Sequence, residues 1–124
     1  MKHFITLLIL AFCFTGCKKD NSNACSLLQQ GLIANDTQRV GKAVDLIIAS
    51  FTSQEYNAQN IDRLANRLSQ CNLEIRGKCF DCIKTLPSQT EIWFSYNASG
   101  TVIQKTIDIS YTPDNKMRFH NMHD

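Results

Sequence analysis

The sequence predicts an α+β domain in which about three N-terminal helices pack on one face of an antiparallel sheet of about four strands. Between residues 25 and 71, apolar residues recur at intervals of three and four, which is the period of amphipathic helices. From residue 73 onward, apolar and polar residues alternate, as in half-buried strands. Short turn sequences separate the alternating segments, so successive strands are expected to be antiparallel neighbours. Helices followed by a run of strands are typical of the α+β class.

Three segments combine a helical apolar stripe with a polar residue suited to capping the helix. The expected caps are Asn23, Asp36 and, for the third helix, Asn57 or Asn60. The stripes are Cys25, Leu28 and Leu32 in the first helix, Val40, Val44, Ile47, Ile48 and Phe51 in the second, and Ile61, Leu64, Leu68 and Cys71 in the third.

Four later segments have the alternation of strands, namely residues 73–79, 91–96, 101–111 and 117–122. Residues 97–100 and 112–116 are turns by composition, because they are rich in Asn, Asp, Ser, Gly and Pro. In the third strand, Ile103, Ile107, Ile109 and Tyr111 share one side. The second helix, with its long stripe, is expected to cover the sheet.

The N-terminus has the layout of a secretory signal. A basic start at Lys2 precedes an apolar run from Phe4 to Phe14, and small or modest residues then lead to Cys17. The run is too short to cross a hydrocarbon core as a permanent helix, which needs about 20 residues. The tetrapeptide Phe14-Thr15-Gly16-Cys17 resembles the bacterial lipobox, with Phe14 where Leu is usual. The resemblance implies acylation of Cys17, with residues 1–16 removed as a lipoprotein signal peptide.

The same resemblance implies where the protein is found. The start Cys17-Lys18-Lys19-Asp20 is similar to that of small Bacteroidota-type lipoproteins, and residues 17–24 would form an acylated, polar tether. Several acyl chains on Cys17, palmitate among them, would anchor the protein durably to a membrane, since each buried methylene adds about 0.8 kcal/mol. The expected location is the cell envelope, at the outer membrane, on its periplasmic or surface face.

Composition restricts the function further. Residues 25–124 are enough for a single domain. The net charge is only +2 and Lys18-Lys19 is the longest basic run, which argues against nucleic-acid binding. Asp45, Glu55, Asp62 and Glu74 are dispersed, and neither a phosphate-binding glycine loop nor a zinc-protease helix motif occurs. We therefore assign no catalytic residue and no cofactor, and the protein or small-molecule ligand is left open.

Four cysteines remain once Cys13 leaves with the signal and Cys17 is acylated. An even number in an exported domain predicts disulfides that staple it. One pairing joins Cys25 to Cys71 between two helices and Cys79 to Cys82 locally. The alternative joins Cys71 to Cys79 or Cys82, and the sequence does not decide between them.

Cys79-Phe80-Asp81-Cys82 is a C-x-x-C motif with two chemical interpretations beyond a structural disulfide. Redox catalysis normally places the first cysteine at a helix N-terminus, but residues 83–87 are too few for a helix. The alternative is a metal set of Cys79, Cys82, His120 and His123, or instead a copper site of Met117, His120, Met122 and His123. The simpler interpretation, a polar final strand that frays into the tail, is preferred for the histidines.

Trp93 is expected on the sheet face opposite Ile92, Phe94 and Tyr96, where an exposed aromatic ring marks a candidate binding patch. The sequence thus predicts a membrane-anchored, non-enzymatic binding or interaction module, with a redox or metal-handling protein that uses Cys79 and Cys82 as the alternative.

Overall fold

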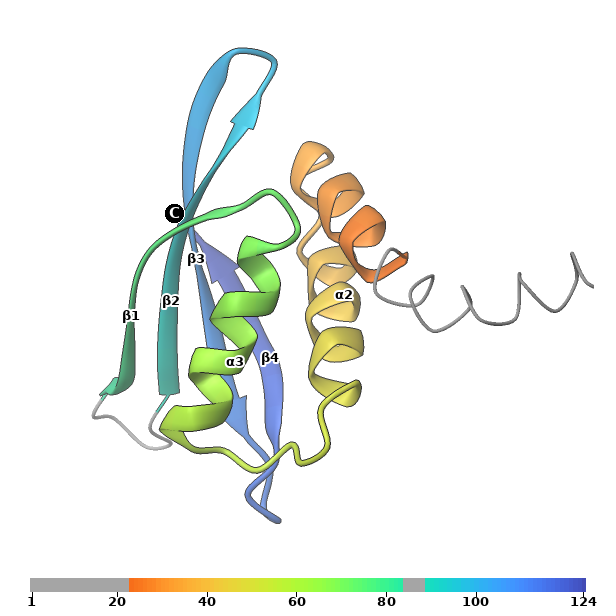
Figure 1. Cartoon of the computed structure of the whole chain (residues 1–124). Coiled ribbons are helices and arrows are strands. Elements are labelled where there is room, and N and C mark those ends of the chain that lie inside the picture. The colour runs from red at the N-terminus through yellow and green to blue at the C-terminus, as the bar shows by residue number, and fades with distance from the viewer. Residues whose placement is uncertain (1–22, 84–88) are drawn as a thin grey trace, which may run out of the picture.

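The computed structural model describes residues 23–83 and 89–124, and it has the predicted α+β architecture. Residues 23–33 are helical, and they are followed by α2 (Thr37–Ala49) and α3 (Ala58–Ser69). The sheet contains β1 (Glu74–Ile83), β2 (Gln89–Ala98), β3 (Thr101–Tyr111) and β4 (Met117–His123), all antiparallel and in the order β1-β2-β3-β4 (Figure 1). The signal peptide and the acylation site predicted at Cys17 lie outside the described residues.

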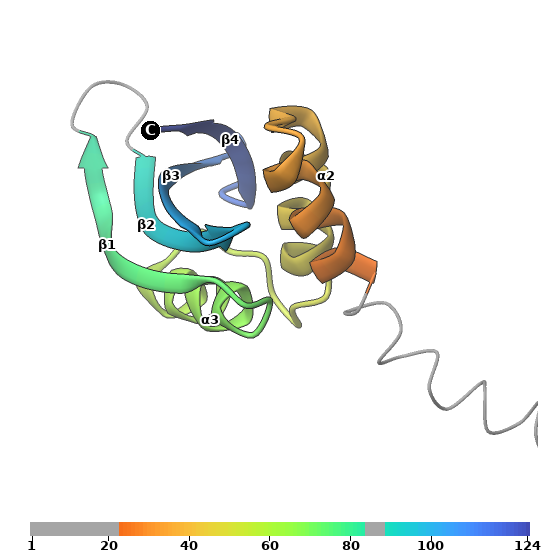
Figure 2. The ribbon, with the colours of Figure 1, turned by 90° about the horizontal axis from the view of Figure 1, so that it is seen from above.

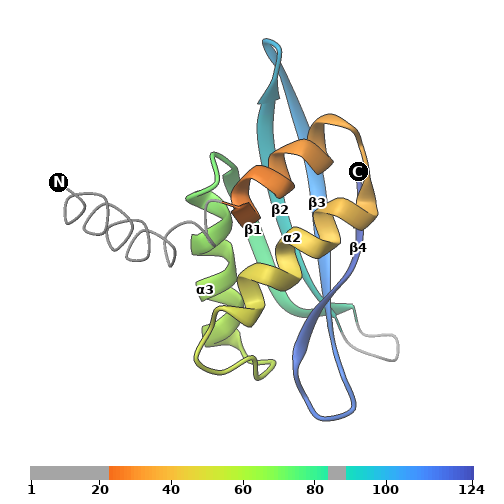
Figure 3. The same cartoon turned by 90° about the vertical axis from the view of Figure 1, so that its right-hand side faces the viewer.

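The helices lie on one side of the sheet. Residues 23–33 and α2 run side by side across it, and α3 lies along β1 (Figure 3). The view from above shows α3 beside β1 and α2 beside β4 (Figure 2). Predicted caps form at Asp36 and Asn57, whose side chains accept hydrogen bonds from the main-chain N–H groups of Arg39 and Asn60.

Several predicted boundaries require correction. Asn23 is already helical and Ala24 is buried, so the tether predicted to reach residue 24 ends before the helix. The reason is that Ala24 continues the apolar stripe one turn before Leu28. The first strand continues through the C-x-x-C motif to Ile83 rather than ending at Cys79. The last strand does not fray, because His123 still pairs with Thr106 of β3.

The core lies between the helical layer and one face of the sheet. The predicted stripes of the three helices are buried, and Phe94 is the largest fully buried side chain beneath them. Burial of each such aliphatic or aromatic side chain contributes about 1.5–3 kcal/mol relative to exposure. The sheet side of this core consists of Ile92, Phe94, Tyr96, Ile107, Ile109, Met117 and Met122.

Two close contacts attach α2 to the edge strand β4. A Cβ atom on Gly41 would lie 2.7 Å from the Phe119 ring, so the absence of a side chain on Gly41 lets the helix approach the strand. Asp45 accepts a hydrogen bond of 2.8 Å from the main-chain N–H of Phe119. The Asp45 side chain thus satisfies a main-chain N–H of an edge strand, which could otherwise pair with a strand of another chain.

Disulfides join Cys25 to Cys71 and Cys79 to Cys82, the first of the two pairings considered from the sequence. The Cα atoms of Cys25 and Cys71 are 5.0 Å apart across a sequence separation of 46. This bond ties the first helix to the end of α3, and the chain-entropy model assigns about 4 kcal/mol to a loop of this length. The Cys79–Cys82 bond closes a short ring within β1.

Tyr56, in the loop between α2 and α3, connects this loop to β1 and β2. Its hydroxyl donates to Asp81 at 2.9 Å and lies 2.8 Å from the Thr90 hydroxyl, which must then be the donor to Tyr56. The Tyr56 ring lies 4.9 Å from the centroids of both Phe80 and Tyr111. Burial, offset in part by the Thr90 bond, raises the pKa of Tyr56 to about 12. Tyr56 therefore donates its hydrogen bond throughout the physiological pH range.

We expect Tyr56→Phe to lower the free energy of unfolding by about 1–3 kcal/mol, because it leaves the fully buried Thr90 hydroxyl without this partner. Tyr111→Phe, which keeps the ring against Tyr56, is the control and should change it by less than about 0.5 kcal/mol. Urea unfolding measures both, and equal losses would contradict this role of the Tyr56 hydroxyl.

Candidate functional site

Chemically active side chains form a row across the sheet face that points away from the helices, here called the outer face. Since directly opposed residues of an antiparallel pair share a face, the register places this row. Cys79 lies opposite Glu91, and Glu91 lies opposite Asp108. His123 lies opposite Thr106, which is two residues from Asp108 and on the same face. All four strands thus contribute to one row.

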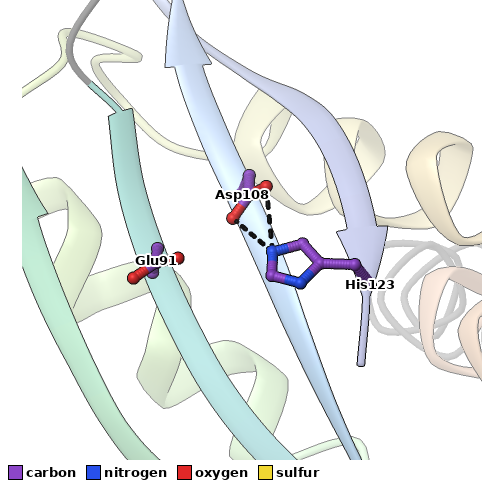
Figure 4. A group of neighbouring side chains, drawn as sticks. All are labelled: Glu91, Asp108 and His123. Atoms are coloured by element: carbon purple, nitrogen blue, oxygen red, sulfur yellow. Dashed lines mark hydrogen bonds and ion pairs between the residues drawn. The ribbon is translucent and has the colours of Figure 1, made fainter. Parts of the chain in front are cut away.

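Three members of the row converge. Donor atoms of Glu91, Asp108 and His123 lie within 4.8 Å of one another, and we call these residues the triad (Figure 4). His123 Nε2 is 3.2 Å from each carboxylate oxygen of Asp108. His123 Nδ1 is 3.1 Å from the main-chain oxygen of Asp124. Only 6% of Asp108 is exposed, whereas Glu91 is half-buried and His123 is exposed.

The surroundings of His123 favour its charged form. Partial burial lowers its pKa, but the hydrogen bonds to Asp124 and Asp108 and the charges of Asp108 and Glu91 outweigh burial, so the pKa of His123 is raised above 6.5. With both ring nitrogens facing acceptors, the imidazolium can donate in both directions. The protonated ring thereby compensates the buried Asp108 carboxylate when no other cation is present.

The triad has the donor chemistry of a divalent metal site. Carboxylate oxygen and imidazole nitrogen bind Zn²⁺ at about 2.0–2.2 Å, so two ligands of one ion lie at most about 4.4 Å apart. The triad needs only small side-chain movements to reach that spacing. Donation from Nδ1–H to the Asp124 oxygen would select the tautomer in which Nε2 carries the ligand lone pair. Three protein ligands leave further coordination positions for water or another molecule.

The structure separates the metal ligands suggested by the sequence. Cys79 and Cys82 are bonded to each other, so neither offers a thiolate, and the predicted set with His120 and His123 does not form in this state. His123 instead joins the two carboxylates. His120 lies at the irregularity where β4 shifts register against β3, and the convergent group found among residues 23–83 and 89–124 does not include it.

Trp93 lies on the outer face, as predicted, with 38% of its surface exposed. Its ring covers Gly77 of β1, where a Cβ atom would come within 2.6 Å of the indole. Because Trp93 is two residues from Glu91 on the same face, and is the single tryptophan of the chain, it is a natural fluorescent reporter for the triad.

Sequence reasoning missed Glu91 and Asp108, although a signal was present. Ser99 and Gly100 both have positive φ, which indicates a tight two-residue hairpin turn. Glu91 lies eight residues before Ser99, and Asp108 lies eight residues after Gly100, so the turn alone brings them opposite each other. The partner of His123 could not be predicted from the β3–β4 turn in the same way, because an irregularity interrupts the pairing of β3 with β4.

Shallow surface hollows lie elsewhere, and two of them border α2. One of about 340 Å³ is lined by residues of α2, of the α2–α3 loop and of the β3–β4 turn, including Asp45, Gln54 and Lys116. A second of about 390 Å³ is lined by Leu27, Lys42, Asp45 and Leu46 on the outside of the helical layer. Neither of these two hollows is lined by a residue of the triad, in which His123 is exposed.

A scan of protein-family models, a search of curated proteins and a search of solved structures each found no match to this chain. Among the described residues, none of the helices is long and apolar enough to cross a membrane.

In metal-free protein, we expect the pKa of His123 to lie above 6.5 and to fall in Asp108→Asn, which removes a negative charge and keeps the shape. Because the folded-state pKa is raised, the His123–Asp108 pair stabilises the fold below pH of about 6.5, and that contribution is lost as the pH rises through the folded pKa. NMR titration of the ring protons measures the shift, with His120 as internal comparison. An unchanged His123 titration in Asp108→Asn would contradict the pairing.

Proposed function

We propose that this chain is a lipid-anchored protein of a bacterial envelope that binds a divalent transition-metal ion through Glu91, Asp108 and His123. The observation that carries the proposal is the convergence of three metal-binding donors from three strands around a buried carboxylate. The protein would act as a non-enzymatic binding module, with the ion as its ligand. The outer membrane, on its periplasmic or surface face, is the proposed location.

Charge balance supports a metal ion as the ligand. Two carboxylates and a neutral imidazole carry a charge of −2, which a divalent cation neutralises. A buried carboxylate is stable only when it is paired with a cation or coordinates a metal. Among the described residues, the ionic partner of Asp108 is His123, which is exposed. A divalent ion in place of the proton on Nε2 would compensate both carboxylates at once. Oxygen and imidazole ligands suit zinc, manganese and iron.

The geometry is less suited to acid–base catalysis. A histidine that activates a nucleophile needs one ring nitrogen directed at the nucleophile and the other at the carboxylate that orients it. Here Nε2 faces Asp108 and Nδ1 faces the Asp124 main-chain oxygen. Neither nitrogen is directed at a hydroxyl or thiol of the described residues.

The lipid anchor is supported by the residues before the domain. The helix that contains residues 23–33 is packed into the core through Ala24 and Leu28, so the tether runs from Cys17 to residue 22. Six residues extend at most about 20 Å. The anchor would therefore hold the domain, and with it the triad, close to the membrane surface.

We expect the metal-free, purified lipoprotein with both disulfides intact to bind one Zn²⁺ ion. His123→Ala should weaken binding at least about 10- to 100-fold, because loss of an outer-shell partner alone typically costs that much. His120→Ala, on the same strand, is the matched control and should bind as the natural chain does. Equilibrium dialysis with metal quantification gives the stoichiometry, and Trp93 fluorescence follows the titration. Equal effects of the two alanine substitutions would exclude the triad.

We expect Cys17→Ser to release the protein from the membrane fraction, because a serine at this position receives no acyl chains. Cys13→Ala, within the segment expected to be removed, is the control and should leave the protein in the membrane fraction. Fractionation with an alkaline wash measures partition, and the intact mass reports acylation. Retention of Cys17→Ser in washed membranes would contradict the anchor.

A further inference from the structure

The Cys79–Cys82 disulfide lies on the same face as the triad. Cys79 is opposite Glu91, and the next residue, Phe80, packs on the helix side against Tyr56. The pairing of β1 with β2 is irregular between Cys79 and Ile83, and Asp81 adopts the left-handed conformation with φ of 58°. This bulge turns Cys82 back so that its sulfur meets that of Cys79 on the outer face.

Contacts other than the disulfide hold this bulge in place. The Tyr56 hydroxyl donates to Asp81 at 2.9 Å, and the Tyr56 and Phe80 rings stack. Thr90, fully buried on the neighbouring strand, completes the group. Because these groups fix the two residues between the cysteines, cleavage of the sulfur–sulfur bond would leave both thiols side by side on the outer face.

The bond is placed where a reductant can reach it. β1 is an edge strand of the sheet, and both Cys79 and Cys82 are half-buried rather than enclosed. In the other disulfide, Cys71 is buried in the core and Cys25 is half-buried. Thiol–disulfide exchange requires access of an attacking thiolate to a sulfur, and the Cys79–Cys82 bond offers two half-buried cysteines where Cys25–Cys71 offers one, so the Cys79–Cys82 bond should be cleaved first.

We propose that reduction of the Cys79–Cys82 bond creates a second metal site, formed by the two thiolates and adjacent to the triad, with Glu91 between the two sites. A dithiol reductant supplies two electrons and two protons, so that its own two thiols become a disulfide while Cys79 and Cys82 become thiols. Binding of Zn²⁺ then releases the two thiol protons, since the thiolate is the ligand. The shared role of Glu91 in this inference rests on the proposed function, in which the triad binds its ion in the oxidised protein.

The register explains why two sites form instead of one larger site. Neighbouring strands are about 4.8 Å apart, so Cys79 on β1 and Asp108 on β3 are separated by about two strand spacings. That is too far for one ion to bind thiolates of β1 together with His123 of β4. Glu91 on β2 lies opposite both Cys79 and Asp108 and would serve as the exchangeable ligand through which an ion passes between the thiolates and the triad.

The test uses the purified lipoprotein in detergent, oxidised or reduced with a phosphine under anaerobic conditions and then freed of reductant. The phosphine takes up oxygen from water as it reduces the bond, and thiol counting confirms that two thiols appear. Zn²⁺ stoichiometry is measured by equilibrium dialysis, and Co²⁺ is used as a second probe because thiolate ligation gives it a charge-transfer absorption. We expect one Zn²⁺ ion in the oxidised protein, two in the reduced protein, and the thiolate absorption only after reduction.

Two controls make the outcome specific. The double variant Cys79→Ser/Cys82→Ser retains Cys25–Cys71 and should bind one Zn²⁺ ion with or without reductant. Alkylation of the two new thiols in the natural chain should have the same effect, which keeps the test valid if the double variant folds poorly. The proposal is overturned if the reduced protein, with two thiols counted, binds a single Zn²⁺ ion without thiolate absorption, or if the second ion persists after alkylation.

The two proposals fail differently. The reduced His123→Ala variant should lose the Zn²⁺ ion at the triad and keep the Zn²⁺ ion bound by the two thiolates. That result would support the second site independently of the first. An oxidised natural chain that binds no Zn²⁺, together with a reduced chain that binds one with thiolate absorption, would overturn the function proposed for the triad and the shared role of Glu91.

Discussion

The pairing of β2 with β3 around the Ser99-Gly100 turn determines both faces of this protein. A two-residue turn with positive φ at both positions allows a single register, and in that register Ile92 lies opposite Ile107. These residues belong to the apolar face beneath the helices. Because strand side chains alternate, the same register places Glu91 opposite Asp108 on the outer face. The core and the triad therefore depend on one geometric choice, and a slip of one residue would destroy both.

Irregularities in β1 and β4, the strands that flank the β2–β3 pair, position the reactive side chains of the outer face. On one side, the bulge in β1 brings Cys79 and Cys82 together and lets Asp81 meet Tyr56. On the other, the shift between β3 and β4 precedes His123, whose ring then reaches diagonally to Asp108. Bulges re-aim side chains and are common beside functional sites. Here both of them border the row of reactive residues on the outer face.

The helical layer contributes to the outer face indirectly. Burial of the stripes of α2 and α3 supplies the main stabilisation, and the Cys25–Cys71 disulfide holds the first helix against the end of α3. Tyr56 then links the α2–α3 loop to β1 through Asp81 and to β2 through Thr90. A sheet braced in this manner can keep a buried carboxylate such as Asp108 on its other face, because the stability needed for it comes from elsewhere.

The sequence by itself determined the class of fold, the period of every helix and strand, the cap at Asp36, and the face of the sheet on which Trp93 lies, while it left the next cap open between Asn57 and Asn60. These features are local, because they follow from spacing and from the chemistry of single residues. The sequence also predicted two disulfides among four cysteines. It left their pairing open, because the pairing depends on the distance between the helices. Only the tertiary structure decided that His123 joins Glu91 and Asp108 while Cys79 and Cys82 bond to each other. The physical reason is that a bulge shifts the register between two strands by one residue and so changes which side chains meet across them. The apolar and polar alternation in the sequence does not reveal such a shift.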